Sequence, residues 1–392
     1  MQDQTPATIR IVNDIAEIPA DAWNALANPD QATFDPFLSH AFLKALEEAG
    51  TTGRRAGWLP YHLVLEGPDG AIAGVCPAYI KSHSQGEYVF DWSWADAYER
   101  AGGRYYPKLQ VAVPFTPVPG RRLLAAPGPE QAANEARLAD GIEALTEKLG
   151  LSSAHITFLT EQQWQRLGAM NYLQRTGKQY HFENDGYRTF DDFLATLSSR
   201  KRKNLRKERQ AALSGDLEIE WVTGSDLTEA HWDAFYEFYI DTGSRKWGHP
   251  YLNREFFSLL GAAMPDHCLL VLVRRNGRYV AGALNMIGGE CLYGRYWGCI
   301  EHHPFLHFEV CYYQAIDFAI ARGLKRVEAG AGGDHKIARG YEPVATYSAH
   351  WIEDPGFRKA VARFLDDERE QMERLRSALA TATPYRKADP ES

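Results

Sequence analysis

The sequence predicts an α/β protein with two tandem domains of one design, each with a mixed central sheet flanked by helices. The chain has 392 residues, more than one hydrophobic core usually supports. Three sequence patterns recur in the same order at a spacing of about 207 to 210 residues. Within each copy, strand-like and helix-like segments alternate in a way that favours a partly antiparallel sheet. An internal duplication explains these observations together.

The repeated patterns give the order of elements in each half: strand, helix, helix, hairpin, strand, helix and strand. The hairpins turn at Asp69-Gly70 and Asn276-Gly277, because these pairs tolerate the positive φ angles of a tight turn. The first copy comprises TIRIV (8–12) with AWNAL (22–26), LVLEGPDGAIAG (63–74), and ANEARLADGIEALTEKLG (133–150) with AHITFL (154–159). The second comprises LEIEWV (217–222) with HWDAF (231–235), LVLVRRNGRYVAG (270–282), and FEVCYYQAIDFAIARGL (308–324) with KRVEAG (325–330).

The repeat sets the expected domain boundaries. We expect a first domain over residues 1–177, a connecting strand and basic helix over 178–215, and a second domain over 216–392 that ends in a C-terminal helix. In the connecting segment, Thr189 suits a helix start and Ser214-Gly215 suits its stop, which predicts one long helix.

Composition excludes several classes of protein. The formal charge of -8 argues against nucleic-acid binding over the whole surface, although a local basic patch can still contact phosphates. The five cysteines form no CxxC pair, so we expect reduced core thiols. The N-terminus does not resemble a signal peptide and no stretch resembles a membrane span, so we expect a cytoplasmic protein.

In the first half, residues 109–124 form a candidate donor-binding loop. A predicted strand ends in Val-Pro and leads to Gly120, Arg121 and Arg122. Backbone N–H groups in a loop of this kind bind phosphates, so these residues are candidates for holding the phosphates of acyl-CoA. A proline-rich surface loop with solvated arginines explains the same pattern.

In the second half, polar residues gather between positions 293 and 343. Pro304 suits the first turn of a helix, and a Gly-rich run at 330–333 precedes a cluster of polar residues. A loop that delivers Lys and Arg to a helix start is a candidate cradle for phosphate or carboxylate. The candidate catalytic residues are Glu301 or Glu309 as general base, and Lys336. The candidate substrate-binding residues are Arg295, Tyr296, Trp297, His307, His335, Arg339 and Tyr341.

Each of these residues also has a structural explanation. Carboxylates in structural salt bridges are commonplace, so the two glutamates need not be catalytic. The i, i+4, i+8 spacing of His303, His307 and Cys311 suits zinc. Pro304 and a helix boundary interrupt that spacing, so we expect core and capping roles and no metal site.

The segment SSRKRKNLRKERQ (198–210) holds seven Lys or Arg and one acid. On a helix, Arg202, Arg206 and Arg209 share one face. A solvated helix surface explains this charge, and a stripe that contacts the phosphates of tRNA or a nucleotide explains it as well.

Three segments together, SSRKRKNLRKER, YWGCIEHHPFLHFEVCYYQAIDFAIARGL and EAGAGGDHKIARGYEP, resemble the FemAB-like proteins of the GNAT superfamily. The resemblance covers nearly the whole chain and implies two tandem GNAT-type domains. In the Fem aminoacyltransferases, two such halves use aminoacyl-tRNA to extend the peptide of a muramyl precursor. Their Gly-rich stretch and lysine align with Lys336, and their basic helix aligns with Ser199 through Arg206. Arg202, Asn204 and Arg206 are therefore further candidate donor-binding residues.

The resemblance implies an N-acyltransferase that moves an acyl or aminoacyl group to an amine, such as that of a cell-wall peptide precursor. The donor substrate would be acyl-CoA or aminoacyl-tRNA, with no tightly bound cofactor, and the acceptor a small-molecule or peptide amine. Two alternatives remain: acetyl-CoA-dependent acetylation of a small amine, and a non-catalytic protein that binds a cell-wall precursor or RNA. The sequence leaves the oligomeric state open.

Overall fold

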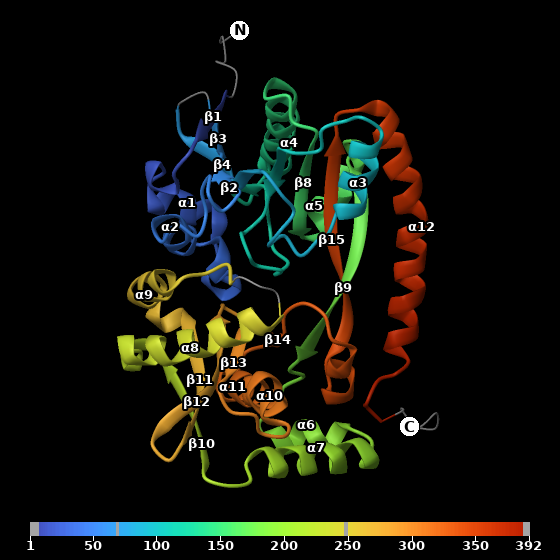
Figure 1. Cartoon of the computed structure of the whole chain (residues 1–392). Helices are drawn as coiled ribbons and strands as arrows, with labels where there is room; N and C mark the ends of the chain where they lie inside the picture. Colours follow the sequence, from blue (N-terminus) through green and yellow to red (C-terminus); the bar gives the residue numbers. More distant parts are fainter. Residues whose placement is uncertain (1–7, 68–69, 247–249, 387–392) are drawn as a thin grey trace. The chain divides into compact units, whose positions relative to one another are not determined.

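The computed structural model describes residues 8–67, 70–246 and 250–386. The chain forms two compact units. Unit 1 consists of residues 1–31, 37–177 and 345–374, and unit 2 consists of residues 32–36, 178–344 and 375–392. Both combine helices with sheets (Figure 1), so the predicted α/β fold class is confirmed.

Unit 1 contains two groups of strands. One is a 4-stranded antiparallel sheet in the order β1-β3-β4-β7. In the other, β15, β8, β6, β5 and β2 follow one another, and β6 pairs with β8 in parallel. The strands are β1 (Thr8–Val12), β2 (Trp58–Pro60), β3 (His62–Glu66), β4 (Ile72–Cys76), β5 (Ala78–Lys81), β6 (Lys108–Val111), β7 (Leu124–Ala125), β8 (Ser153–Leu159) and part of β15 (Glu342–Ile352). The helices are α1 (Ala20–Ala27), α2 (His40–Glu48), α3 (Trp92–Arg100), α4 (Gln131–Lys148), α5 (Glu161–Ala169) and most of α12 (Pro355–Ala380).

Unit 2 is built on strands in the order β10-β11-β12-β13-β14-β9. All neighbours are antiparallel except β13 and β14, which are parallel. The strands are β10 (Leu217–Thr223), β11 (Cys268–Arg275), β12 (Arg278–Ile287), β13 (Cys291–Cys299), β14 (Arg326–Glu328) and part of β9 (Leu173–Glu183). The helices are α6 (Phe190–Thr196), α7 (Ser199–Ala212), α8 (Glu229–Lys246), α9 (Arg254–Ala263), α10 (Leu306–Phe308), the π-helix η6 (Glu309–Tyr313), α11 (Gln314–Arg322) and the 3-10 helix η7 (Asp334–Arg339).

The same pairing pattern occurs in both units, as a duplication predicts. The antiparallel set β1-β3-β4 of unit 1 matches β10-β11-β12 of unit 2, and the parallel pair β6 and β8 matches β13 and β14. The β11-β12 hairpin turns at Asn276 and Gly277, whose φ angles of 52° and 77° lie in the left-handed region. The corresponding Asp69 lies outside the described residues. Trp23 and Trp232, which match in the repeat, are both buried.

Each sheet is completed by the strand that follows the other repeat in the chain. Residues 347–352 of β15 pair antiparallel with β8 in unit 1. Residues 181–183 of β9 pair antiparallel with β14 in unit 2. The chain therefore passes from unit 1 to unit 2 within β9 and returns within β15.

This pairing changes the domain boundaries expected from the sequence. Residues 178–215 do not form a separate connection but belong to unit 2. Residues 345–374, expected in the second domain, belong to unit 1 because their strand pairs with β8. The expected C-terminal helix is α12.

The single long helix expected after Thr189 is two helices, α6 and α7. Thr189 caps α6 as predicted, because its side chain accepts a hydrogen bond from the backbone N–H of Asp192. The break falls at Leu197 and Ser198, whose ψ angles of 154° and 146° are extended. Leu197 is buried and forms a β-bridge with Tyr385. Burial of one leucine and its bridge thus outweigh the helical tendency of the sequence around it.

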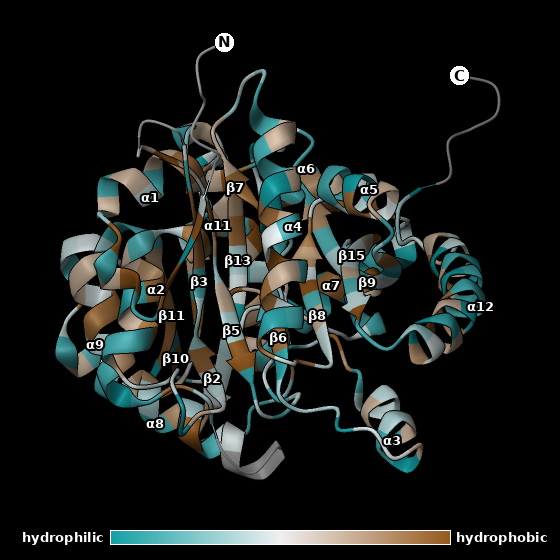
Figure 2. Cartoon of the chain, turned by 90° about the horizontal axis from the view of Figure 1, so that it is seen from above, coloured by the Kyte–Doolittle hydropathy of each residue, from teal (hydrophilic) through white to brown (hydrophobic). Residues whose placement is uncertain are grey.

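Figure 2 shows hydrophobic residues concentrated on strands such as β11 and many hydrophilic residues along α12. Within the described residues, α12 buries just two side chains, Val361 and Leu365. No helix in this part of the chain is long and apolar enough to cross a membrane. All five cysteines are free thiols, and three of them, Cys76, Cys268 and Cys291, are buried.

Unit 1 encloses a charged network. The Lys108 ammonium donates to Ser84 Oγ at 2.9 Å, Glu87 Oε2 at 2.7 Å and Asp91 Oδ2 at 2.5 Å, and Tyr105 donates to the same Asp91 oxygen at 2.6 Å. All these side chains are buried. Burial would lower the pKa of Lys108, but the charges of Glu87 and Asp91 outweigh it and raise the pKa. The positive charge of Lys108 is therefore compensated by two carboxylates of the same unit.

We expect Lys108→Met to lower the free energy of unfolding by about 3–5 kcal/mol, because it leaves the buried Asp91 without its lysine and leaves Glu87 with only Lys81, at 3.8 Å. Urea denaturation at pH 7 measures the change. Lys44→Met is the matched control, since Lys44 forms an exposed ion pair with Glu48, and we expect it to cost less than about 1 kcal/mol. Equal effects of the two substitutions would contradict a stabilising role for the network.

Candidate active site

The candidate site in unit 2 starts where the parallel strands β13 and β14 part. Their pairing ends at Tyr293 opposite Glu328. Beyond this point β13 has a bulge, since Asn285 of β12 lies opposite Gly294 and Leu284 lies opposite Tyr296, which leaves Arg295 as the extra residue. Bulges are common beside active sites because they redirect side chains.

The expected Gly-rich loop follows β14 directly. Gly330, Gly332 and Gly333 all have positive φ angles, between 72° and 94°, which residues with a Cβ rarely adopt. A Cβ on Gly330 would also lie 3.4 Å from the Gly294 carbonyl oxygen. The glycines therefore let the loop turn tightly against β13, and η7 begins immediately after it.

Lys336 of η7 turns back into this loop. Its Nζ donates to the carbonyl oxygens of Ala329 at 2.8 Å and Gly330 at 2.9 Å. The side chain is buried, and no ion pair to it is present among the described residues. Burial lowers the pKa of Lys336 to about 8. The site thus holds a cation that is solvated by two carbonyls, with one N–H of the ammonium left for a further partner.

A buried carboxyl lies beside the loop, at the end of β14. Glu328 is 3% exposed, its Oε1 lies 3.2 Å from Arg326 Nε, and its Oε2 lies 3.7 Å from His181 Nε2. Burial raises the pKa of Glu328 to about 7 and lowers the pKa of His181 to about 3. A carboxyl with a pKa near neutrality can accept and release a proton at working pH.

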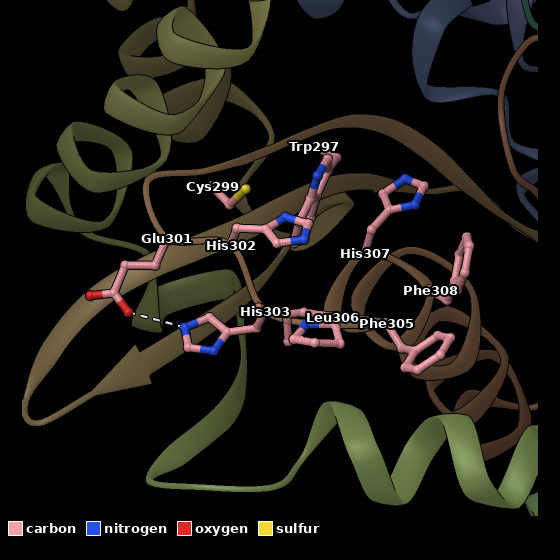
Figure 3. A pocket seen from close by; sticks show the side chains of 10 residues that line it. Trp297, Cys299, Glu301, His302, His303, Phe305, Leu306, His307 and Phe308 are labelled. Atoms are coloured by element: carbon pink, nitrogen blue, oxygen red, sulfur yellow. Dashed lines mark hydrogen bonds and ion pairs between the residues drawn. The ribbon is translucent and has the colours of Figure 1, made fainter.

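A pocket of about 370 Å³ opens between the end of β13 and the start of the helical segment 306–322. We call it the aromatic pocket. Figure 3 shows side chains from both segments around it, with Glu301 reaching to its edge and paired with His303. Its lining is formed by Trp297, Cys299, Glu301, His302, His303, Pro304, Phe305, Leu306, His307 and Phe308.

The π-helix and η7 form one packed layer behind the pocket. Tyr312 and His335 share a hydrogen bond of 2.9 Å, and the rings of His307 and Phe308 contact both of them. The guanidinium of Arg339 lies 3.4 Å from the centre of the Phe308 ring. Since His335 precedes Lys336 directly, this layer connects the aromatic pocket to the lysine.

Arg339 of η7 and Tyr313 of η6 are both held by Glu208 of α7. Arg339 Nη2 donates to Glu208 at 2.9 Å, and the Tyr313 hydroxyl donates to the same carboxylate at 2.5 Å. Tyr341, expected to bind substrate, is fully buried. Its hydroxyl has no hydrogen-bond partner within residues 8–67, 70–246 and 250–386.

The two glutamates expected as general bases have other partners. Glu309 is fully buried and accepts from Arg209 Nη2 at 2.8 Å and from Gln314 at 2.8 Å. Glu301 accepts from Arg275 at 3.0 Å. Hydrogen bonds from His303 and Arg275 lower the pKa of Glu301. These contacts favour structural roles for both carboxylates.

Two more expected residues lie on β13 next to the bulge. The Arg295 guanidinium lies 5.2 Å from the centre of the Tyr296 ring. Tyr296 in turn packs against Tyr239 of α8, with ring centres 5.1 Å apart. Trp297, the next residue, lines the aromatic pocket.

The basic helix α7 packs against the π-helix η6, and α6 lies next to it (Figure 1). Arg209 is committed to Glu309 and Asp317, and Arg206 forms an exposed ion pair with Asp191 at 2.8 Å. Asn204 is exposed. The other cations of the helix have no ion-pair partner in the described part of the chain: Arg200, Lys201, Arg202, Lys203 and Lys207.

The candidate donor loop of unit 1 is held by its own arginines. Arg121 donates to the carbonyl oxygens of Ala27 and Ala125, both at 3.0 Å. Arg122 is buried and donates to the carbonyl oxygens of Thr157 and Val118. Gly120 donates its N–H to Phe158. These contacts favour a structural role for the two guanidinium groups, which bind the loop to its neighbours.

Among the described residues, no group of three or more His, Cys, Asp or Glu side chains is arranged to hold a metal ion. His303, one of the three residues whose spacing suits zinc, is hydrogen-bonded to Glu301. The cluster around the pocket is therefore one of aromatic contacts and hydrogen bonds.

Three residues of the site are not among those that the sequence pattern singles out: Glu328, His181 and Tyr312. Glu328 ends a predicted strand just before the Gly-rich run, and this position is a signal that the sequence does contain. His181 lies far away in the sequence and reaches Glu328 only because β9 pairs with β14.

Comparison with solved structures gives the fold. FemX aligns with a TM-score of 0.56 and 13% identity, over 90% of this chain and 100% of FemX. A conserved protein of unknown function from Bacteroides thetaiotaomicron aligns with a TM-score of 0.53 and 14% identity, over 88% of this chain and 100% of that protein. L-PGS from Bacillus licheniformis aligns with a TM-score of 0.50 and 11% identity, over 85% of this chain and 98% of L-PGS. No curated protein matches the sequence.

The family assignment rests on a sequence model. The FemAB-like family, described as peptidoglycan biosynthesis/recognition, matches residues 14–387. This match confirms the family, and the likeness to FemX over nearly the whole of both chains confirms the fold that the sequence resemblance implies. The chain belongs to the FemAB-like family.

Proposed function

We propose that the protein transfers an acyl or aminoacyl group to an amine, and that the chemistry takes place beside Lys336. The observation that carries the proposal is the buried Lys336 ammonium, which is bound to two carbonyls and has no carboxylate partner in the described residues. A buried cation without a counter-ion is costly for a fold. A negative charge that develops on a substrate would compensate it.

Acyl transfer develops such a charge. The amine nitrogen attacks the acyl carbonyl carbon, a C–N bond forms, and the carbonyl oxygen becomes an oxyanion. Lys336 donates its free N–H to this oxygen and stabilises it. The carbonyl then re-forms as the bond between the acyl carbon and its carrier breaks, and the carrier leaves with the electron pair.

The attacking amine must lose one proton. We assign this role to Glu328, because its carboxyl lies at the end of the strand that leads into the lysine loop and its Oε2 has no hydrogen-bond partner in the described residues. The carboxylate accepts the proton from the amine, and the departing carrier takes up a proton in turn, so that protons balance over the cycle.

The acceptor and the donor follow from the family and from α7. The family description favours a peptidoglycan precursor with an amino group as acceptor. The unpaired cations of α7 favour a donor with several phosphates, and aminoacyl-tRNA fits them better than CoA does. The engaged guanidinium groups of Arg121 and Arg122 give less support to CoA binding in unit 1.

We expect Lys336→Met to lower kcat by about 100-fold or more, the effect of removing one oxyanion donor, without lowering Tm. Because burial lowers the pKa of Lys336, the charged lysine destabilises the folded protein at pH 7. Removing the charge should therefore not lower Tm. The assay combines UDP-linked muramyl pentapeptide with aminoacyl-tRNA or acetyl-CoA. Lys325→Met, which removes an exposed lysine, is the control. Wild-type turnover in Lys336→Met would remove the residue from the mechanism.

We expect the rate to fall as the pH drops through about 7, because Glu328 becomes protonated there and can no longer accept a proton. Glu328→Gln should reduce kcat by about 100-fold and abolish this limb of the pH profile. Profiles of kcat between pH 5.5 and 9 test both statements. Glu342→Gln, at an exposed glutamate, should keep the limb. If the rate of Glu328→Gln still falls as the pH drops through about 7, the general base is another residue.

We expect the double substitution of Arg202 and Lys203 by Gln to weaken tRNA binding and to reduce the slope of log Kd against log salt by about 1 to 2. Fluorescence anisotropy with bulk aminoacyl-tRNA at several NaCl concentrations measures this slope. The matched control replaces the exposed Lys359 and Arg363 of α12 by Gln. The same slope in both variants would rule out α7 as the phosphate contact.

A further inference from the structure

The ionisable side chains that line the aromatic pocket are one carboxylate and three histidines, His302, His303 and His307. Its lining contains no Lys or Arg. Its one carboxylate, Glu301, lies at the edge (Figure 3) and is bonded at 3.0 Å to both Arg275 and His303. A charged ligand group would lose water here and would find neither a Lys or Arg side chain nor an unengaged carboxylate in the lining, which is unfavourable. The lining therefore suits an uncharged group.

The helix that starts at the pocket does not offer an anion cradle either. Helix starts bind phosphates through backbone N–H groups that lack partners. Here Leu306 N–H bonds to the His303 carbonyl, and the N–H groups of Phe308 and Glu309 both bond to the Phe305 carbonyl at 2.9 Å and 3.0 Å. These bonds occupy three of the N–H groups that a phosphate at the start of the helix would need.

The lining consists mainly of rings. Trp297 and His307 meet edge to face with centres 5.5 Å apart, and His307 lies 5.5 Å from Phe308. Phe305 continues the series at 6.3 Å from Phe308. Aromatic side chains prefer edge-to-face and offset contacts of this kind with further rings. At about 370 Å³ the pocket also falls in the size range of small-molecule sites.

Phe305 combines a strained backbone with an exposed side chain. Its backbone has a φ angle of 62°, and its side chain is 42% exposed. A positive φ costs a residue with a Cβ about 1 kcal/mol or more. In this conformation the Phe305 carbonyl accepts from the N–H groups of Phe308 and Glu309, and the phenyl ring stays exposed in the lining of the pocket.

The rings at the back of the pocket lead to the proposed catalytic lysine. His307 and Phe308 pack on His335, and His335 is adjacent to Lys336. If Lys336 holds the oxygen of the acyl carbonyl, the group attached to that carbonyl is close to this layer of rings. This step rests on the proposed function.

We propose that the aromatic pocket binds an uncharged aromatic side chain of the acyl group that is transferred. The pocket then selects the donor by its acyl part, while the phosphates of the donor are held elsewhere. A donor with a glycyl or acetyl group would leave the rings unfilled and would bind more weakly.

The test measures binding by calorimetry and ligand-observed NMR, with N-acetyl-phenylalaninamide as probe and N-acetyl-glycinamide as reference. We expect the aromatic probe to bind about tenfold more tightly than the reference. Phe305→Gly removes the ring but keeps the positive φ that glycine adopts freely, so it should fold with an unchanged Tm. We expect it to bring the aromatic probe to the level of the reference. Phe364→Ala removes a similarly exposed ring on α12 and should change neither affinity.

The outcomes separate this inference from the proposed function. Equal binding of the two probes, or equal loss in Phe305→Gly and Phe364→Ala, overturns the assignment of the pocket, whatever the enzyme assay shows. Lys336→Met should retain the aromatic probe while losing turnover. Binding that depends on Phe305, together with no acyl transfer from any donor, supports the pocket and contradicts the proposed function.

Discussion

The completion of each sheet by the strand that follows the other repeat is the constraint on which the rest of the structure depends. A strand such as β8 or β14 without its neighbour would expose a row of backbone N–H and C=O groups, which must find partners. Residues 347–352 supply them for β8, and residues 181–183 supply them for β14. In unit 2 the same pairing sets His181 opposite Glu328 and so creates the buried acid of the proposed site.

The two units bury lysines in opposite ways. Lys108 of unit 1 has two carboxylates within 2.7 Å, and their charges raise its pKa above the normal value despite complete burial. Lys336 of unit 2 has two carbonyl oxygens, and burial lowers its pKa to about 8. In the first arrangement the buried charges compensate one another, so that removing one partner is costly. In the second arrangement the ammonium has no negative charge beside it among the described residues. A group that stabilises a negatively charged transition state needs this property, because the charge is then compensated only during the reaction.

Several departures from regular structure fall in the short stretch between β13 and β15. β13 has a bulge at Arg295, Phe305 takes a left-handed backbone, and the helix after it contains a π-helical turn. In unit 1 the matching helix, α4, is a regular helix of 18 residues. Bulges, strained residues and π-turns concentrate at functional sites, because they cost stability and persist where they position something. Positive φ angles and bulges also occur in unit 1, so the π-helical turn is the feature that sets this stretch of unit 2 apart from its counterpart α4.

The sequence by itself determined the α/β class, the duplication, the Asn276-Gly277 turn, the family, and the Gly-rich loop that carries Lys336. All of these are local patterns or repeats of them. Local patterns can be recognised in a sequence because they follow from backbone sterics. Only the tertiary structure decided the unit boundaries, the break of the basic helix at Leu197, the engagement of Glu309 by Arg209, and the meeting of His181 with Glu328. Each of these depends on a partner about 100 residues or more away in the chain. No local preference specifies such a partner, because long-range pairing is chosen by the burial and hydrogen bonding of the whole fold.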